Sequence, residues 1–258
     1  MSHSIFQSNE NSPYGDLTRE EFYKHHKIMH RQSFMLNKQN TRIFIQPWPC
    51  GHGSCYTSES SWLFELNAVA MTKAGFFICS TGYIPSIQPL VQDCIQYFDS
   101  ARADHPKLPA ILYGESLGGA IATLLCVRQE SVWNGLILIP SWRIVITKPP
   151  ASISQKEGWK RKMISKSLNR LALEKNEHIQ RISHELQVPL LILQGGEDKV
   201  CDPEAAKLVY ESAGSKDKTM KISPGMSHQL ISEPNETVQL VFNAMLSWLE
   251  VRADLSKI

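Results

Sequence analysis

Short runs of almost exclusively apolar residues recur along the middle of the chain. They are Phe76–Cys79, Ala110–Tyr113, Leu136–Ile139 and Leu190–Leu193. Strands of a parallel sheet that is covered on both faces have this uninterrupted apolar character, because neither face meets water. We therefore predict a buried strand at each run, and a further strand at Thr219–Ile222.

Longer segments with apolar residues at helical spacing separate these runs. Between residues 87 and 102, for example, Leu90, Cys94, Ile95 and Phe98 fall on one face of a helix. The predicted helices are Ser61–Lys73, Ile87–Arg102, Leu117–Gln129, Pro203–Ala213 and Glu236–Val251. Strands that alternate with amphipathic helices indicate an α/β fold, with a mostly parallel sheet flanked by helices.

The N-terminal part of the chain adds a helix and two strands. Residues 18–21, Thr-Arg-Glu-Glu, form a capping box that predicts a helix running to about Arg31. Two short strands are predicted at Ser33–Leu36 and Thr41–Ile45, joined by the polar turn Asn37–Asn40.

Two stretches break the alternation of strands and helices. The segment Pro47–Cys55 holds two prolines and two glycines, so we expect that it forms no central strand. The segment Pro140–Gln187 is basic and helical in character, without a clear strand. We interpret it as an insertion over one edge of the sheet, within one domain that spans residues 1–258.

Composition and charge narrow the class of protein. With 258 residues, 42% hydrophobic and 20% charged, the chain can bury a sizeable core and is not expected to be disordered. A formal charge of +2 gives no reason to expect a nucleic-acid partner. No apolar run approaches the about 18 residues of a membrane-spanning helix, and the polar N-terminus does not look like a signal peptide.

These features favour a cytoplasmic protein, in which the six cysteines are free thiols. The final residues Ser-Lys-Ile differ by one residue from the Ser-Lys-Leu peroxisomal signal, which leaves peroxisomal import as a weaker alternative.

The motif Gly114-Glu-Ser-Leu-Gly118 matches the pattern Gly-x-Ser-x-Gly. It follows a predicted strand and opens a predicted helix, as a nucleophile elbow does. In such a turn the glycines leave room for the backbone, and the hydroxyl of Ser116 is exposed at the end of the sheet. The alternative interpretation is a glycine-rich turn without chemistry.

A serine hydroxyl needs a base to become a nucleophile, and a carboxylate to orient that base. In a sheet of this kind the order along the chain is serine, acid, histidine. Asp198 follows the strand predicted at Leu190–Leu193, with its neighbour Glu197 as the weaker candidate, and His228 follows the strand predicted at Thr219–Ile222. The carboxyl ends of parallel strands share one edge of the sheet, so we predict a triad of Ser116, Asp198 and His228.

These features together resemble the α/β-hydrolase family, and within it the plant monoacylglycerol lipase-like group that includes the caffeoylshikimate esterases. The similar stretches span nearly the whole chain: Ser12–Gly15, Ser60–Trp62, Tyr113–Ala120, Val132–Ile137, Val188–Leu191, Gly195–Asp202 and Leu246–Leu249. The resemblance implies a serine ester hydrolase that acts on acyl glycerols, lysophospholipids or related small esters. It also implies that residues 140–187 are a shortened helical lid.

The chain departs from the pattern of that family near Tyr56. The family has a central strand there that ends in His-Gly, and the turn after it supplies one backbone N–H of the oxyanion hole. We expect this strand to be missing, with Cys50–Tyr56 as its remnant. Ser54 and Tyr56 are then both candidates for this donor, whereas the N–H of Leu117, next to the nucleophile, is the other donor.

Three further segments of the family pattern are missing, after Cys79, after Ile139 and near Arg170–Leu173. The gaps resemble skipped exons or a faulty gene model. Losing one oxyanion donor costs about 2.7–4 kcal/mol of transition-state stabilisation, so an incomplete hole slows an enzyme without silencing it.

Other candidate sites are weaker. Cys50, His52 and Cys55 lie close together, but three ligands without a second pair give little support for zinc, and we predict no metal. No glycine-rich nucleotide loop is present, so we predict no cofactor. The Lys- and Arg-rich segment Lys156–Lys175 is interpreted as a solvated helix face, with peripheral membrane contact as the alternative.

The sequence therefore predicts a serine esterase whose partner is a small ester or lipid. The first alternative is a hydrolase-like chain, impaired by its gaps, that acts as a binding module or has no function. A second alternative is an acyltransferase with the same triad and an acceptor other than water.

Overall fold

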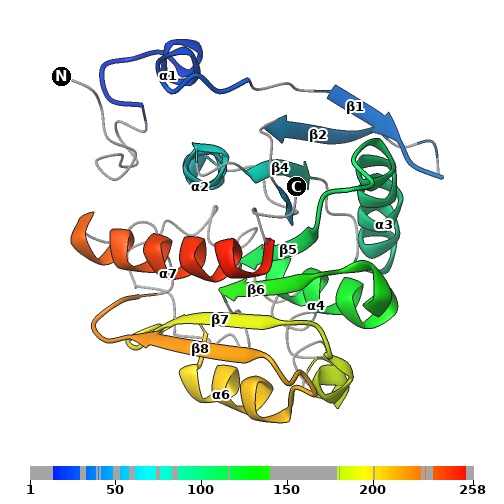
Figure 1. Ribbon diagram of the computed structural model, residues 1–258, viewed down its shortest axis with the longest axis vertical. Helices are drawn as coiled ribbons and strands as arrows, with labels where there is room; N and C mark the ends of the chain where they lie inside the picture. The colour runs from blue at the N-terminus through cyan, green and yellow to red at the C-terminus, as the bar shows by residue number, and fades with distance from the viewer. Residues whose placement is uncertain are drawn as a thin grey trace, which may run out of the picture.

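An eight-stranded sheet organises the protein, with strand order β1-β2-β4-β3-β5-β6-β7-β8 (Figure 1). The computed structural model describes residues 14–29, 33–38, 40, 42–48, 53–57, 62–73, 76–82, 87–115, 117–139, 179, 181–199, 201–227, 230 and 235–253. The strands are β1 (Ser33–Leu36), β2 (Arg42–Trp48), β3 (Gly53–Thr57), β4 (Phe76–Gly82), β5 (Ala110–Glu115), β6 (Gly135–Ile139), β7 (Leu190–Gly195) and β8 (Lys218–Ser223). Strands β3 to β8 pair in parallel, whereas β2 is antiparallel to both β1 and β4. The prediction of a mostly parallel sheet is confirmed.

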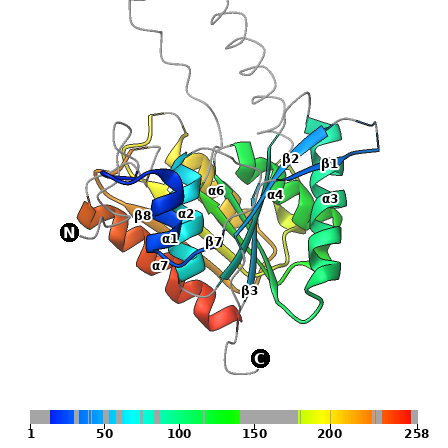
Figure 2. The same cartoon turned by 90° about the horizontal axis from the view of Figure 1, so that it is seen from above.

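Helices cover both faces of this sheet. They are α1 (Arg19–His25), α2 (Trp62–Lys73), α3 (Ile87–Asp104), α4 (Leu117–Arg128), α6 (Pro203–Ser212) and α7 (Asn235–Ala253), with short 3-10 turns η2 (Glu130–Val132) and η3 (Ser183–Glu185). Figure 2 shows α7 and α3 on opposite sides of the sheet.

The two faces of the strands bury different residues. In β5, Leu112 packs in a core cluster with residues of α3, α4 and α6, whereas Ile111 and Tyr113 pack in a second cluster with α1, α2 and α7. Side chains of a strand point alternately to opposite faces, and here both faces are apolar. This is why the strand sequences read as continuous apolar runs.

The expectation that the central strand is missing was wrong. β3 (Gly53–Thr57) lies between β4 and β5 and pairs in parallel with both. The prolines do not disturb it, because they come before its first residue. Pro47 belongs instead to β2, where it pairs with Cys79 of β4 beyond the last residue paired with β1, so its lack of an N–H is tolerated.

Most predicted elements are confirmed to within a few residues, and the largest difference is in the first helix. The capping box of Thr18 and Glu21 is present, with the Thr18 N–H donating to Glu21 Oε2 at 2.8 Å and the Glu21 N–H donating to Thr18 Oγ1 at 3.2 Å. The helix nevertheless ends at His25 instead of Arg31. Lys27 has a φ of 56°, a left-handed conformation that no helix continues through.

The thiols of Cys94, Cys126 and Cys201 are free, as predicted, and all three are buried. Burial raises the pKa of the Cys94 thiol to about 12, with the Asp93 carboxylate adding to the effect. Since the thiolate is the reactive form, we expect these three thiols to resist alkylation by iodoacetamide at pH 8 in the native protein and to react fully in urea. Mass spectrometry of the alkylated peptides checks this, and modification of Cys94 in the native state would contradict the burial.

Candidate active site

The predicted nucleophile motif, Gly114–Gly118, lies where a strand turns sharply into a helix. β5 ends at Glu115 and α4 begins at Leu117, so Ser116, which lies outside the described residues, is the only residue between them. A Cβ atom on Gly114 would lie 2.5 Å from the carbonyl oxygen of Gly118 and 2.6 Å from the Cα of Gly119. The strand and the helix approach too closely there for any side chain, which explains the glycine of the motif.

Asp198 lies three residues beyond the end of β7, and its side chain is buried. The backbone N–H of Cys201 donates to its Oδ1 at 2.8 Å, and the Nε2 of Gln194 donates to its Oδ2 at 3.2 Å. Both carboxylate oxygens therefore accept hydrogen bonds, one from a side chain of β7 and one from the backbone just before α6. Glu197, the weaker acid candidate, is exposed.

The loop after β7 is bonded to the loop that leads to His228. The Gly196 N–H donates to the Ser223 carbonyl at 2.8 Å, and the Glu197 N–H donates to the Met226 carbonyl at 2.9 Å. His228 itself lies outside the described residues, two positions after Met226. The loops that carry Asp198 and lead to His228 thus leave the same edge of the sheet as neighbours, as predicted from the parallel strands.

Gly195 sits where these two loops touch. A Cβ atom on it would lie 2.2 Å from the Ser227 carbonyl oxygen and 2.6 Å from the Met226 carbonyl oxygen. Backbone must move to make room, so the Gly195→Ala variant is expected to displace the loop that leads to His228. If the ester hydrolysis expected from the sequence is the activity, its kcat should fall about 100-fold. Steady-state kinetics on the folded variant measure this effect.

The Gly135→Ala variant is the matched control. Its Cβ would lie 2.7 Å from Cη2 of Trp248, which is a side chain and not backbone, at the amino-terminal end of β6. We expect this variant to lose stability and to keep its kcat. Equal kcat values for the two glycine variants would contradict a positioning effect of Gly195.

The candidate oxyanion donors lie at different levels along the direction of the strands. Leu117 is the first residue of α4, whose free N–H groups point toward the elbow end of the sheet. Ser54 pairs with Ala110 of β5 and Tyr56 pairs with Leu112. At a rise of about 3.3 Å per residue, Ser54 is about 17 Å short of the level of Glu115, the last residue of β5, and Tyr56 is about 10 Å short. Of the two candidates, Tyr56 is the nearer, and the carboxyl end of β3 at Thr57 is nearer still.

Sequence reasoning did not find Gln194 or the Cys201 N–H as partners of the acid. The strand was predicted to end at Leu193, whereas β7 continues to Gly195 and includes Gln194. A buried polar residue at the end of an otherwise apolar strand was the available signal.

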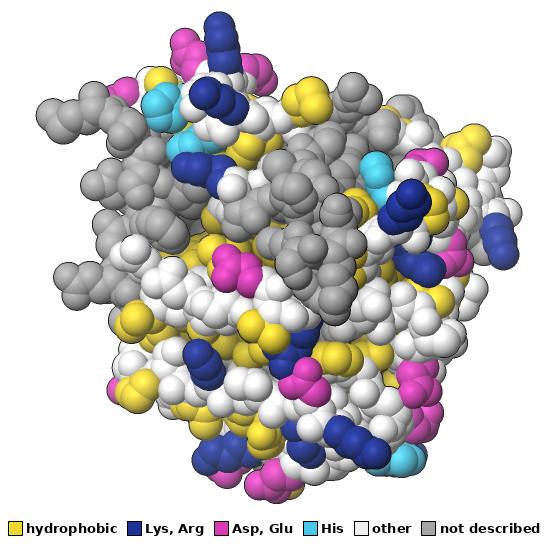
Figure 3. All heavy atoms as spheres, in the orientation of Figure 1, with side chains coloured by type: hydrophobic (Ala, Val, Ile, Leu, Met, Phe, Trp, Pro, Cys, Tyr) yellow, Lys and Arg dark blue, Asp and Glu magenta, His cyan; other side chains and the backbone are white. Residues whose placement is uncertain are grey.

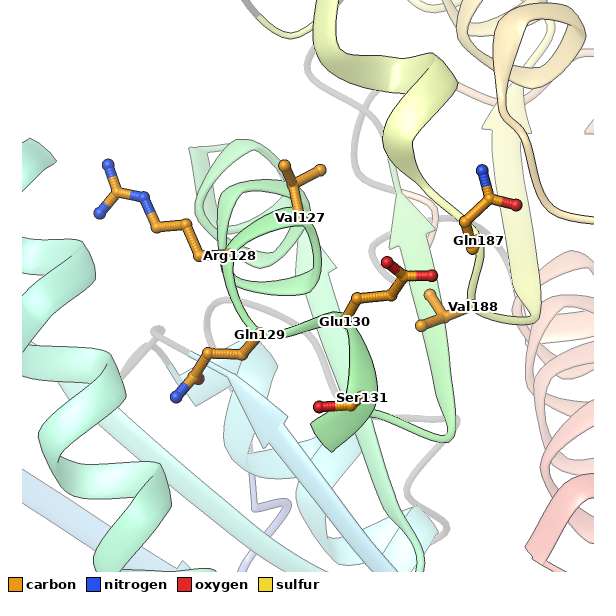
Figure 4. A pocket seen from close by; sticks show the side chains of 7 residues that line it. All are labelled: Val127, Arg128, Gln129, Glu130, Ser131, Gln187 and Val188. Carbon is orange, nitrogen blue, oxygen red and sulfur yellow. The ribbon is translucent and has the colours of Figure 1, made fainter.

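One pocket formed by described residues lies away from the carboxyl ends of the strands. It has a volume of about 580 Å³ and is lined by Val127, Arg128, Gln129, Glu130, Ser131, Gln187 and Val188. Figure 4 shows the end of α4 and η2 opposite Gln187 and Val188. These residues precede β6 and β7, so the pocket opens at the amino-terminal ends of the strands and not beside Asp198.

Within the described residues, no group of three His, Cys, Asp or Glu side chains could hold a metal ion. The helices of that part include none with the length and hydropathy of a membrane span. On the face shown in Figure 3, the basic and acidic side chains are interspersed. Of the weak zinc candidate, Cys50 and His52 lie outside the described residues. So does nearly all of the predicted lid at 140–187, including Lys156–Lys175.

Comparison with known proteins extends these observations. The profile of the family described as serine aminopeptidase, S33, matches residues 74–184 and 151–235. Caffeoylshikimate esterase from Arabidopsis thaliana is 24% identical over 302 aligned residues, covering 92% of this chain and 90% of that protein. Monoglyceride lipase from Homo sapiens is 30% identical over 200 residues, covering 63% of this chain and 65% of that protein.

The alignment with the Arabidopsis protein is longer than the 258 residues of this chain, so that relative contains segments that this chain lacks. Among solved structures, a soluble variant of monoglyceride lipase from Saccharomyces cerevisiae in complex with a substrate analog superposes with a TM-score of 0.70. It is 14% identical and covers 87% of this chain and 95% of that one.

The predicted α/β-hydrolase fold is thereby confirmed. The matched profile begins just before β4 and reaches the first residue of α7, and it includes Ser116, Asp198 and His228. The chain belongs to the α/β-hydrolase family described as serine aminopeptidase, S33.

Proposed function

We propose that this protein is a serine ester hydrolase of the monoacylglycerol lipase type, with Ser116, Asp198 and His228 as its catalytic triad. The observation that carries the proposal is the turn between β5 and α4, in which one residue, Ser116, separates a buried strand from a helix. The relatives named as monoglyceride lipase and caffeoylshikimate esterase support the ester class of substrate.

In the proposed mechanism, Ser116 Oγ attacks the carbonyl carbon of the ester while His228 accepts the hydroxyl proton. The tetrahedral intermediate then expels the alcohol, which receives that proton from His228. Water, activated by the same histidine, attacks the acyl-enzyme and releases the carboxylic acid. Asp198 orients the imidazole and stabilises its protonated form, for which its tethered and buried carboxylate is suited.

The negative oxygen of the intermediate needs hydrogen-bond donors that are fixed before the reaction starts. The Leu117 N–H, at the first position of α4, is the first proposed donor. The second proposed donor is a backbone N–H at or just beyond the carboxyl end of β3. Tyr56 lies nearer that end than Ser54, but both are paired within the sheet well short of the level of Glu115, the last residue of β5. No cofactor takes part in this mechanism.

The proposed substrates are monoacylglycerols, lysophospholipids and hydroxycinnamoyl esters, which share an acyl carbonyl and an alcohol leaving group. Hydrolysis of a panel of the three, followed by chromatography of the released acids, ranks them. The monoacylglycerol is expected to be cleaved most rapidly, since several relatives are named for that substrate.

The decisive experiment is labelling of the folded protein with a fluorophosphonate probe, followed by peptide mapping. The proposal requires a single label on Ser116, slowed by an excess of monoacylglycerol and absent from heat-denatured protein. A folded protein that takes no label would overturn the proposal and favour the alternative of an impaired, hydrolase-like chain. The presence of β3 at the centre of the sheet removes one reason for that alternative.

A further inference from the structure

We infer that Gln194 is a positioning residue of this active site, which holds the carboxylate of Asp198 in the direction that the catalytic histidine requires. The inference rests on the proposed function, because it assigns Asp198 as the acid of the triad. Its basis is the contact of the Gln194 Nε2 with Asp198 Oδ2 at 3.2 Å, together with the burial of both side chains.

Gln194 is a buried polar residue in a strand that is otherwise apolar up to that point. The four preceding residues of the strand, Leu190–Leu193, are all apolar and buried, and Gln194 is only 1% exposed. By the alternation of side chains along a strand, it shares a face with Leu190 and Ile192, which pack in the cluster that includes α6. An apolar residue would satisfy that position if packing alone decided it.

The orientation of the Gln194 amide is fixed by its neighbours. Its Nε2 donates both to the Gly195 carbonyl at 3.0 Å and to Asp198 Oδ2 at 3.2 Å. If the amide were turned over, its oxygen would face two other acceptors, so only this orientation is allowed. The two N–H groups of the amide thereby tie the acid to the end of its own strand.

The oxygen atom of the Gln194 amide differs from its nitrogen in having no partner. The Oε1 of Gln194 is buried and has no hydrogen-bond partner within the described part of the chain. An unpaired buried acceptor is destabilising, which offsets part of the stabilisation from the two contacts of the Nε2. What distinguishes Gln194 from other buried polar side chains is the contact of its Nε2 with Asp198, the proposed acid.

The consequence for the acid is a restricted rotation of its carboxylate. The Cys201 N–H holds Oδ1 from one side, at 2.8 Å, and Gln194 holds Oδ2 from the other. These two donors, one on β7 and one in the segment before α6, fix the plane of the carboxylate and hence the direction of its remaining lone pairs. A triad acid acts through that direction, because it sets the orientation of the imidazole.

The test is the Gln194→Met variant, which keeps the approximate length of the side chain and removes both the donor and the unpaired acceptor. We expect kcat for monoacylglycerol hydrolysis to fall about 10- to 100-fold, with KM within about twofold of wild type. The melting temperature is expected to stay the same or to rise. A loss in kcat without a loss in stability separates positioning from a structural role.

Gln129 offers a matched control at the opposite edge of the sheet. Its Nε2 lies 3.4 Å from both carboxylate oxygens of Asp99, and its Oε1 is also buried without a partner in the described chain. The Gln129→Met variant therefore changes the same chemical groups away from Asp198, and kcat is expected to stay at the wild-type value.

The outcomes distinguish this inference from the proposed function. A wild-type protein that cleaves no ester would overturn the proposed function, and the positioning role with it. An active wild type with an unchanged kcat in Gln194→Met would overturn the positioning role alone. If Gln194→Met does not fold, the Gln194→Asn variant provides the test. Its amide is one methylene too short to reach Asp198. The same loss of kcat is therefore expected.

Discussion

Replacement of Ser116 by alanine is expected to lower kcat for ester hydrolysis about 10⁶-fold and to abolish fluorophosphonate labelling. Removing the nucleophile of a triad costs about as much as removing the whole triad, because the three groups act as a unit. The close approach of Gly114 to Gly118 and Gly119 builds the turn independently of the side chain at 116, so the fold is expected to survive. Steady-state kinetics and circular dichroism measure the two effects.

Ser131 provides the control for this variant. It is an exposed serine of η2, beside the pocket at the amino-terminal edge of the sheet. The Ser131→Ala variant is expected to keep both its labelling and its kcat. Loss of labelling in both variants, or in neither, would contradict the assignment of Ser116 as the nucleophile.

The buried parallel strands were predictable because burial on both faces leaves only apolar residues in them. β5 through β7 therefore stand out in the sequence, and the loops after β5, β7 and β8 could be placed at one edge of the sheet. That placement is sufficient to nominate Ser116, Asp198 and His228, since the carboxyl ends of parallel strands converge.

β3 shows where this reasoning fails. Gly53-Ser-Cys-Tyr-Thr57 has no continuous apolar run and follows a segment rich in proline and glycine. Its strand conformation comes from pairing with β4 on one side and β5 on the other. Such pairing is a tertiary effect, which local propensity does not encode.

The hydrogen-bond partners of Asp198 could not be predicted, for a related reason. The contact between Gln194 and Asp198 depends on how far β7 continues past Leu193, and the contact from Cys201 depends on how the chain turns before α6. Boundaries of elements and the geometry of turns are the features that sequence patterns fix least well. The residues proposed for the chemistry were therefore visible in the sequence, whereas the groups that hold Asp198 in place were not.

The Asp198→Asn variant is expected to lower kcat about 10⁴-fold, the second largest effect among these substitutions. An amide has one acceptor in place of two, so it stabilises the imidazolium poorly and favours the wrong tautomer of the histidine. The structure predicts a second unfavourable effect of the amide, a repulsion between two hydrogen-bond donors. If the new oxygen accepts from the Cys201 N–H, the new NH₂ group faces the Nε2 of Gln194, donor against donor. Stopped assays of monoacylglycerol hydrolysis at long incubation times can follow a loss of this size.

Two neighbouring acids serve as controls for Asp198. Asp202 caps α6 by accepting from the Glu204 N–H at 3.0 Å, and asparagine caps a helix equally well, so Asp202→Asn is expected to leave kcat unchanged. Glu197→Gln is also expected to be active, because that side chain is exposed. A 10⁴-fold loss in Glu197→Gln together with an active Asp198→Asn would move the acid to Glu197. The tether from Gln194 would then hold a carboxylate that takes no part in catalysis.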